Sequence, residues 1–185
     1  MAGKKGEMFT HAAGFTFGDK EAPQNVGPSG VRIEHRIGVN APAEAIWAQL
    51  ADIPGWSSWN PLYPQAAGEL RIGSRLDLTV AIPGQAHRKI RPVILDWVPN
   101  DQIHWRLSAL GGLVQSTRYL EIEILGPTNC IFSNGEIFGG LLGPTVARQL
   151  GRSVRRGFAA MGEAVKARAE AASQSAGTAP TSGTP

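Results

Sequence analysis

The chain has 185 residues, 42% of them hydrophobic, which is enough to bury one substantial core but hardly two. Its 18 Lys and Arg against 15 Asp and Glu give a formal net charge of +3, without the dense basic clustering of a dedicated nucleic-acid binder. We therefore expect no nucleic-acid partner. The single cysteine, Cys130, excludes an internal disulfide and cannot nucleate a metal site alone.

The two ends of the chain have no periodic apolar face. Residues 1–30 mix Gly, Pro, Lys and isolated Phe, and residues 171–185 are small and polar. We predict a flexible N-terminal arm at 1–30, one domain at 31–170 and a disordered C-terminal tail at 171–185. Lys4 and Lys5 are not followed by the roughly 7–15-residue apolar stretch of a signal peptide, and no run approaches a membrane-spanning length. These features predict a soluble cytoplasmic protein.

The first predicted elements are a strand and two short helices. Residues 31–39 alternate between apolar and charged side chains, which is typical of a half-buried strand. Asn40 and Pro42 then supply a helix start, and the helix ends before Pro54. A second short helix or turn follows at 56–64.

From residue 76 onward, alternating segments are separated by short turns, and the period changes near the end. The turns are Pro83-Gly84, 99–101, Gly111-Gly112 and 126–128, which predicts an antiparallel meander. Between Val146 and Val165, apolar residues recur at spacings of three and four, which indicates one long amphipathic helix. We predict an α+β fold in which a curved antiparallel sheet of about seven strands encloses a cavity with this C-terminal helix.

Three segments carry a resemblance to a known superfamily: VNAPAEAIWAQLADIPGWSSWNP at 39–61, IGSRLDLTVAIPG at 72–84 and GEIFGGLLGP at 135–144. With the order of elements, they resemble the SRPBCC superfamily over roughly residues 31–168. This superfamily contains the START lipid-transfer domains, the birch-pollen-allergen proteins and the bacterial polyketide cyclase/dehydrase proteins, of which the last are the most similar. The resemblance implies a helix-grip fold that binds a hydrophobic ligand.

The resemblance does not name an activity, because the superfamily includes carriers, cyclases, aromatases, chaperone activators and oxygenase domains. In many bacterial relatives, a His stands two positions before the Glu of the last-but-one segment. This chain has Asn134 at that position. A catalytic role of that His therefore does not transfer.

The strand at 114–125 predicts an inward-facing arginine. Leu120 sets the inward parity, and Arg118 shares it, so this charge needs a partner. If the turn places Ile124 opposite Cys130, then Arg118 lies opposite Glu136, with Cβ atoms about 4.5–5.5 Å apart. The pair is either a structural ion pair or a polar anchor for a carbonyl, hydroxyl or carboxylate on an apolar ligand.

Other candidate site residues follow from parity and from the helix-grip resemblance. His35 faces inward and could approach Glu136, either as part of a general base or as a satisfied core histidine. We place Trp59, Asn60 and Tyr63 at the cavity mouth, because the short helices cap the cavity in this fold. The remaining predicted lining residues are Trp105, Leu120, Phe132, Asn134, Phe138, Leu150, Val154 and Phe158.

Three functions remain open at this stage. The leading hypothesis is a binding or carrier protein for a lipid, quinone, polyketide or aromatic compound. The rival is a cyclase/aromatase in which Arg118, Glu136, His35 or Asn60 directs proton transfer and water loss. The third is an interaction module of the chaperone-activator type. With no catalytic triad, phosphate loop or metal-ligand spacing in the sequence, we expect no cofactor and no metal.

The last predicted helix also carries a basic face that includes Arg148, Arg152 and Arg155. This face is either an ordinary solvated surface or a site of transient contact with anionic lipid headgroups.

Overall fold

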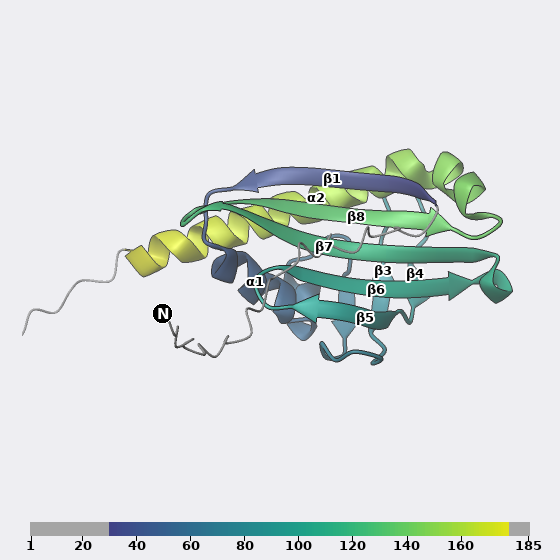
Figure 1. Ribbon diagram of the computed structural model, residues 1–185, viewed down its shortest axis with the longest axis horizontal. Coiled ribbons are helices and arrows are strands. Elements are labelled where there is room, and N and C mark those ends of the chain that lie inside the picture. Colours follow the sequence, from purple (N-terminus) through teal and green to yellow (C-terminus); the bar gives the residue numbers. More distant parts are fainter. Residues whose placement is uncertain (1–29, 178–185) are drawn as a thin grey trace, which may run out of the picture.

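The computed structural model describes residues 30–177 and contains two helices, two 3-10 turns and eight strands in this range (Figure 1). In chain order they are β1 (Val31–Val39), α1 (Ala43–Ala51), η1 (Pro54–Ser58), β2 (Gln65–Ala67), β3 (Asp77–Val80), β4 (Arg88–Ile90), β5 (Val93–Val98), β6 (Gln102–Ala109), η2 (Leu110–Gly112), β7 (Val114–Gly126), β8 (Asn129–Gly139) and α2 (Gly143–Gly177). The predicted α+β order is confirmed. The predicted arm, apart from Gly30, and the last eight residues lie outside the described range.

The strands form two antiparallel sheets rather than the single sheet of about seven strands that the sequence predicted. The larger sheet has the order β1-β8-β7-β6-β5, and the smaller has the order β2-β3-β4. The run from His87 to Val98 divides at Pro92, because proline has no backbone N–H to donate to a ladder. A bridge between Arg75 and Val93 still holds the smaller sheet beside the β5 edge.

Helix α2 covers the inner face of the larger sheet and closes the core. Its buried residues Val154, Phe158, Met161 and Val165 recur at spacings of four, three and four, as the sequence pattern predicted. Figure 1 shows α2 running along the sheet behind β1 and β8, and residue contacts join it to both strands. The apolar stripe of α2 therefore provides the second layer that the sheet requires.

The helix is longer than the sequence predicted. It continues to Gly177, so residues 171–177 belong to α2 and not to the predicted tail. This segment, AASQSAG, contains three alanines and has no glycine or proline before its last position. Because alanine has the strongest intrinsic helix preference, a small and polar composition does not end the helix here.

The part of the molecule between α1, η1 and α2 is filled with side chains. Ile46 and Leu50 of α1 and Trp56 of η1 are each at most 1% exposed. Trp47 stacks on Trp97 of β5, with ring centroids 6.1 Å apart. The open space of the fold therefore lies toward the other end of the sheet.

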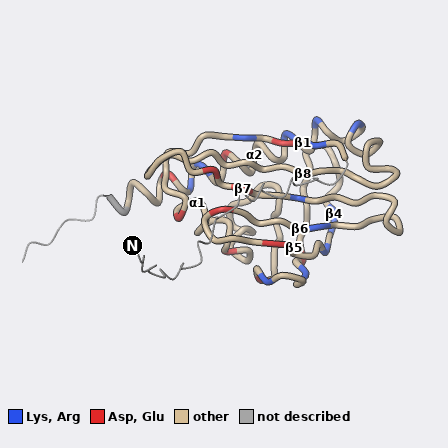
Figure 2. Tube along the Cα trace, in the orientation of Figure 1, with Lys and Arg blue, Asp and Glu red and all other residues tan. Residues whose placement is uncertain are grey.

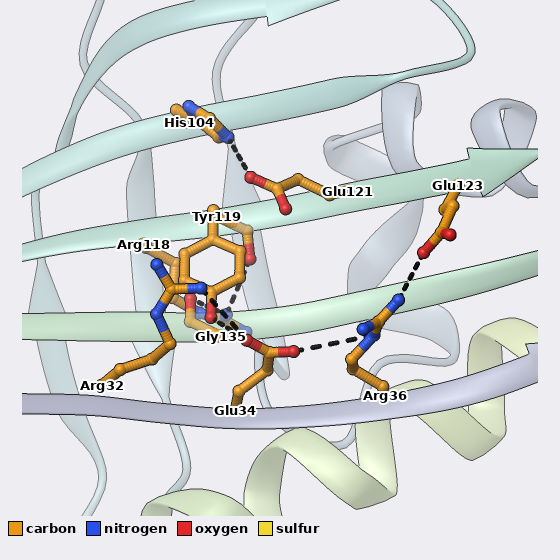
Figure 3. A network of polar contacts seen from close by, with 9 residues as sticks. All are labelled: Arg32, Glu34, Arg36, His104, Arg118, Tyr119, Glu121, Glu123 and Gly135. Carbon is orange, nitrogen blue, oxygen red and sulfur yellow. Dashed lines mark hydrogen bonds and ion pairs between the residues drawn. The ribbon is translucent and has the colours of Figure 1, made fainter. Parts of the chain in front are cut away.

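The outer face of the larger sheet carries a polar network (Figure 3). The Tyr119 hydroxyl of β7 donates a hydrogen bond to Glu34 Oε2 of β1 at 2.6 Å, and the side chain passes over Gly135 of the intervening β8. An added Cβ at Gly135 would collide with the Tyr119 ring. Arg36 forms an ion pair with Glu123 on the same face.

Candidate functional site

A cavity of about 580 Å³ lies between the larger sheet, the smaller sheet and the N-terminal half of α2. Its size falls within the range of about 300–1,000 Å³ that is usual for small-molecule sites. The apolar and aromatic lining is Leu62, Tyr63, Val80, Ile82, Ile90, Trp105, Leu107, Ala109, Leu110, Val114, Phe138, Val146, Leu150, Val154 and Phe158. Most of the wall is therefore suited to an apolar or aromatic compound.

Arg118 of β7 is 2% exposed at one wall of this cavity. Its Nε donates a hydrogen bond to the Tyr63 hydroxyl at 3.2 Å, and its Nη2 donates to Asn134 Oδ1. Nη1 donates to the carbonyl oxygens of Tyr119 at 3.1 Å and Gly135 at 2.7 Å. The guanidinium is therefore held from several directions, and few of its five N–H groups remain for a ligand.

Two aromatic rings complete the surroundings of this arginine. The Cζ of Arg118 lies 3.9 Å from the centroid of the Phe158 ring on α2 and 5.8 Å from that of the Trp105 ring on β6. A dehydrated cation gains from such contact with aromatic faces. Arg118 is thus joined to Tyr63 and to β7 and β8 by hydrogen bonds, and to α2 by its contact with the Phe158 ring.

The predicted opposition of Arg118 and Glu136 is confirmed. The β7–β8 register places Ile124 opposite Cys130 and Arg118 opposite Glu136. A direct ion pair between the two side chains is not formed. None of the ion pairs within 4.0 Å among residues 30–177 joins Arg118 to Glu136. The guanidinium instead reaches along β8 to Asn134, where the amide oxygen and the Gly135 carbonyl accept its protons.

Glu136 and Tyr63 are the titratable groups of the cavity whose pKa values are shifted. Burial raises the pKa of the Glu136 carboxyl, while the Arg118 charge and a hydrogen bond with Ser116 act in the opposite direction. Burial also raises the pKa of the Tyr63 hydroxyl, against the lowering influence of Arg118. Both groups are therefore shifted toward their protonated forms. We call Ser116, Arg118, Glu136, Asn134 and Tyr63 the Arg118 cluster.

His35 does not approach Glu136 as the sequence suggested. Its strand partner is Asn134, whereas Glu136 lies opposite Ile33. The ring of His35 packs against α2, where an added Cβ at Gly162 would stand 3.1 Å from Nδ1. That nitrogen has no hydrogen-bond partner among the described residues. No ion pair joins His35 to Glu136 among the described residues, so the predicted His–carboxylate pair is not formed.

Trp59 and Asn60 do not line the cavity mouth. Asn60 is 3% exposed, and its Oδ1 accepts hydrogen bonds from the backbone N–H groups of Leu62 and Tyr63. Trp59 packs under the C-terminal half of α2, with the Arg168 guanidinium 5.6 Å from its ring centroid. Asn60 thereby shapes the turn that delivers Tyr63, which does line the cavity.

Leu120, Phe132 and Asn134 face inward but lie in the filled core beside the cavity, each at 0% exposure. Asn134 donates from Nδ2 to the Phe158 carbonyl of α2 at 2.8 Å, so this side chain joins the sheet, Arg118 and the helix. The predicted residues that do line the cavity are Tyr63, Trp105, Arg118, Glu136, Phe138, Leu150, Val154 and Phe158.

The sequence interpretation missed a set of basic residues that also line the cavity: Arg75, Arg88, Lys89 and Arg91. The run Arg88-Lys89-Ile90-Arg91 carries the signal, because three of its four residues are basic. Arg91 forms an ion pair with Asp77 at 2.7 Å, and among the described residues no ion pair is formed by the other three. We call these four residues the basic rim.

Residues 30–177 were also searched for a metal site and for a membrane-spanning helix. No group of three or more His, Cys, Asp or Glu side chains is arranged to hold a metal ion there. In the same range, no helix has the length and apolar character needed to cross a membrane.

A curved sheet that grips a long C-terminal helix around a lined cavity defines a helix-grip protein of the SRPBCC type. Residues 30–170 match the family described as "Polyketide cyclase / dehydrase and lipid transport", and the chain belongs to this family. The comparison with curated protein sequences found no match.

Solved structures support the same fold. The Zhui aromatase/cyclase from Streptomyces sp. R1128 aligns with a TM-score of 0.65 at 23% identity, over 80% of this chain and 99% of that chain. A START superfamily protein from Mycobacterium smegmatis aligns with a TM-score of 0.54 at 21% identity, over 78% and 98%. Norcoclaurine synthase from Thalictrum flavum, in complex with dopamine and hydroxybenzaldehyde, aligns with a TM-score of 0.57 at 17% identity, over 88% and 95%. At these identities the likeness shows the fold and not the activity.

Proposed function

We propose that this protein binds a hydrophobic or aromatic small molecule in the cavity between the sheet and α2. The observation that carries the proposal is the combination of a cavity of about 580 Å³, a mostly apolar and aromatic wall, and the polar Arg118 cluster at one side of it. The family description, with its reference to lipid transport, supports the same class of ligand.

The polar part of the ligand contacts Glu136 and Tyr63 rather than Arg118. The Tyr63 hydroxyl accepts a hydrogen bond from Arg118 and keeps its own proton to donate. Glu136 lines the cavity, and its raised pKa favours a protonated carboxyl that both donates and accepts. These groups suit a ligand with a carbonyl or hydroxyl, while Arg118 positions the Tyr63 hydroxyl.

A cavity-filling variant tests this proposal. Leu150 lines the cavity on α2, so Leu150→Trp should displace an aromatic probe such as 1-anilinonaphthalene-8-sulfonate, whose fluorescence rises on binding to the wild-type chain. Leu141→Trp is the matched control, because this residue is 81% exposed and does not line the cavity. Equal probe binding by both variants, or no binding by the wild type, would place the ligand elsewhere and refute the proposal.

A second candidate function is a cyclase or dehydratase reaction on a bound polyketide-like chain. The observation that favours it is a carboxyl with a raised pKa beside a tyrosine hydroxyl in an apolar cavity, an arrangement suited to general acid–base catalysis. Under this function, Glu136→Gln should keep probe binding but lose turnover of a linear poly-β-ketone substrate. Under the carrier function, the wild-type chain releases such a compound chemically unchanged, as mass spectrometry would show.

A further inference from the structure

Three leucines are exposed at the end of the molecule where η2 meets the turn between β8 and α2 (Figure 1). Leu110 is 66% exposed, Leu113 45% and Leu141 81%. The two loops are joined, because the Leu142 N–H donates a hydrogen bond to the Leu113 carbonyl at 2.9 Å. We call Leu110, Leu113 and Leu141 the leucine tip.

The backbone of the leucine tip is strained as well as exposed. Leu110 adopts a left-handed conformation with φ of 52°, which is unfavourable for a bulky residue other than glycine. Burial of the side chain within the molecule does not offset this strain, because Leu110 is exposed. A leucine that is both strained and exposed is explained more simply by a contact outside the chain.

Basic side chains flank the leucine tip on two sides. The four residues of the basic rim are exposed and line the same cavity as Leu110. Arg148 and Arg152 project from the N-terminal part of α2, both exposed and without an ion pair among the described residues. Figure 2 shows Lys and Arg gathered toward this end of the fold, on α2 and around β4, with Asp and Glu mostly toward the other end.

We propose that the leucine tip docks the mouth of the cavity on an anionic membrane surface. The leucines sit on two projecting loops rather than in a groove, so they match a soft apolar layer better than the shaped pocket of a protein partner. The basic rim, Arg148 and Arg152 then meet the phosphate groups of anionic lipids. Because Leu110 also lines the cavity, docking joins the cavity to the bilayer, and an apolar ligand exchanges without crossing water.

This inference goes beyond the proposed ligand binding, and its test needs no cavity ligand. Purified full-length chain is mixed with phosphatidylcholine vesicles, with or without phosphatidylglycerol, and bound protein is recovered by flotation. We expect binding to the vesicles that contain phosphatidylglycerol and much weaker binding to pure phosphatidylcholine. The double variant Leu113→Ser/Leu141→Ser should lower the partition coefficient about a hundredfold, because two buried leucines contribute about tenfold each.

A matched control lies at the opposite end of the same sheet. Ile124 and Leu125 are 62% and 61% exposed at the end of β7, about 33 Å along the strand from Val114. Ile124→Ser/Leu125→Ser should bind vesicles as the wild type does. A similar loss in both double variants would mean that any exposed apolar residue suffices, and it would overturn the proposal.

Separate variants test the contribution of the basic side chains to vesicle binding. Arg148→Gln/Arg152→Gln should lower binding to the anionic vesicles about fivefold per charge, and added salt should remove the difference. Arg36→Gln, a paired arginine on the outer face of the sheet, should have no effect. Unchanged thermal unfolding confirms that each variant is folded. Absence of vesicle binding by the wild type, under conditions in which a basic peptide such as polylysine binds the same anionic vesicles, would overturn the membrane proposal without affecting the cavity-probe result.

Discussion

The two faces of β7 place similar chemical groups in opposite surroundings. Arg118 and Tyr119 are consecutive, so their side chains point to opposite faces of the sheet. Inside, Arg118 is 2% exposed and is held by Tyr63 and Asn134. Outside, Arg36 is paired with Glu123, and these side chains are 51% and 54% exposed. The two arginines carry the same charged group, so a comparison between them shows the effect of hydration on an arginine contact.

Hydration decides which of these contacts stabilises the fold. An exposed ion pair exchanges good water contacts for a modest attraction that salt screens, so its net contribution is small. A dehydrated arginine has lost its water, so every missing acceptor costs free energy. The inner face should therefore respond to single substitutions much more strongly than the outer face does.

The largest expected effect is that of Arg118→Met, which should lower the free energy of unfolding by about 3–5 kcal/mol. Asn134 Oδ1 and the Gly135 carbonyl would lose a donor, and the contact with the Phe158 ring would lose its charge. Urea denaturation measures the change. Adding Glu136→Leu should not restore stability, since Glu136 does not supply the hydrogen bonds of Arg118. A double variant as stable as the wild type would show that the two charges are the dominant interaction.

A second prediction concerns the pH dependence of the free energy of unfolding that arises from Glu136 on the inner face of the sheet. Since burial raises the pKa of its carboxyl in the folded chain, the protonated form is favoured by folding. The wild type should therefore lose stability relative to Glu136→Gln as the pH rises from the ordinary carboxyl pKa through the raised one. Urea denaturation across this pH window measures the difference. A difference that grows in the opposite direction would mean that Arg118 dominates over burial.

The sequence predicted the architecture of this inner face better than its contacts. Alternation and a short turn were enough to place Arg118 opposite Glu136, because strand parity and register are local properties. The partner Tyr63 is 55 residues away in a segment that follows η1, and only the folded chain brings it to the guanidinium. Asn134 was predicted to line the cavity, but its side chain instead accepts a hydrogen bond from Arg118 and donates one to the Phe158 carbonyl.

The incorrect predictions for residues at the cavity mouth have a similar origin. Asn60 was predicted at the cavity because the short helices cap the cavity in this fold, but its side-chain oxygen accepts hydrogen bonds from the backbone of the next turn. The basic rim was missed because a strand pattern does not tell which edge of a sheet will border a cavity. Pro92 separates β4 from β5 and so helps to define that border.

A smaller effect is expected for Tyr119→Phe on the outer face. The substitution removes one hydrogen bond to Glu34 but keeps the ring beside Gly135, so unfolding should become easier by about 1–2 kcal/mol. Burial and the Glu34 carboxylate raise the pKa of Tyr119, so the hydroxyl stays protonated as the donor over the accessible pH range. A loss as large as that of Arg118→Met would remove the difference between the two faces.

The smallest effect should be that of Arg36→Gln, which breaks the exposed ion pair with Glu123. Because both side chains are about half exposed, we expect a change in the free energy of unfolding of less than about 1 kcal/mol. A double-mutant cycle with Glu123→Gln isolates the pair from other effects of each substitution. The coupling measured by urea denaturation should disappear in high salt, since the Debye length falls to about 3 Å at 1 M ionic strength. A coupling above about 2 kcal/mol that survives in high salt would show that hydration does not set the strength of these contacts, and the contrast with Arg118 would then need another cause.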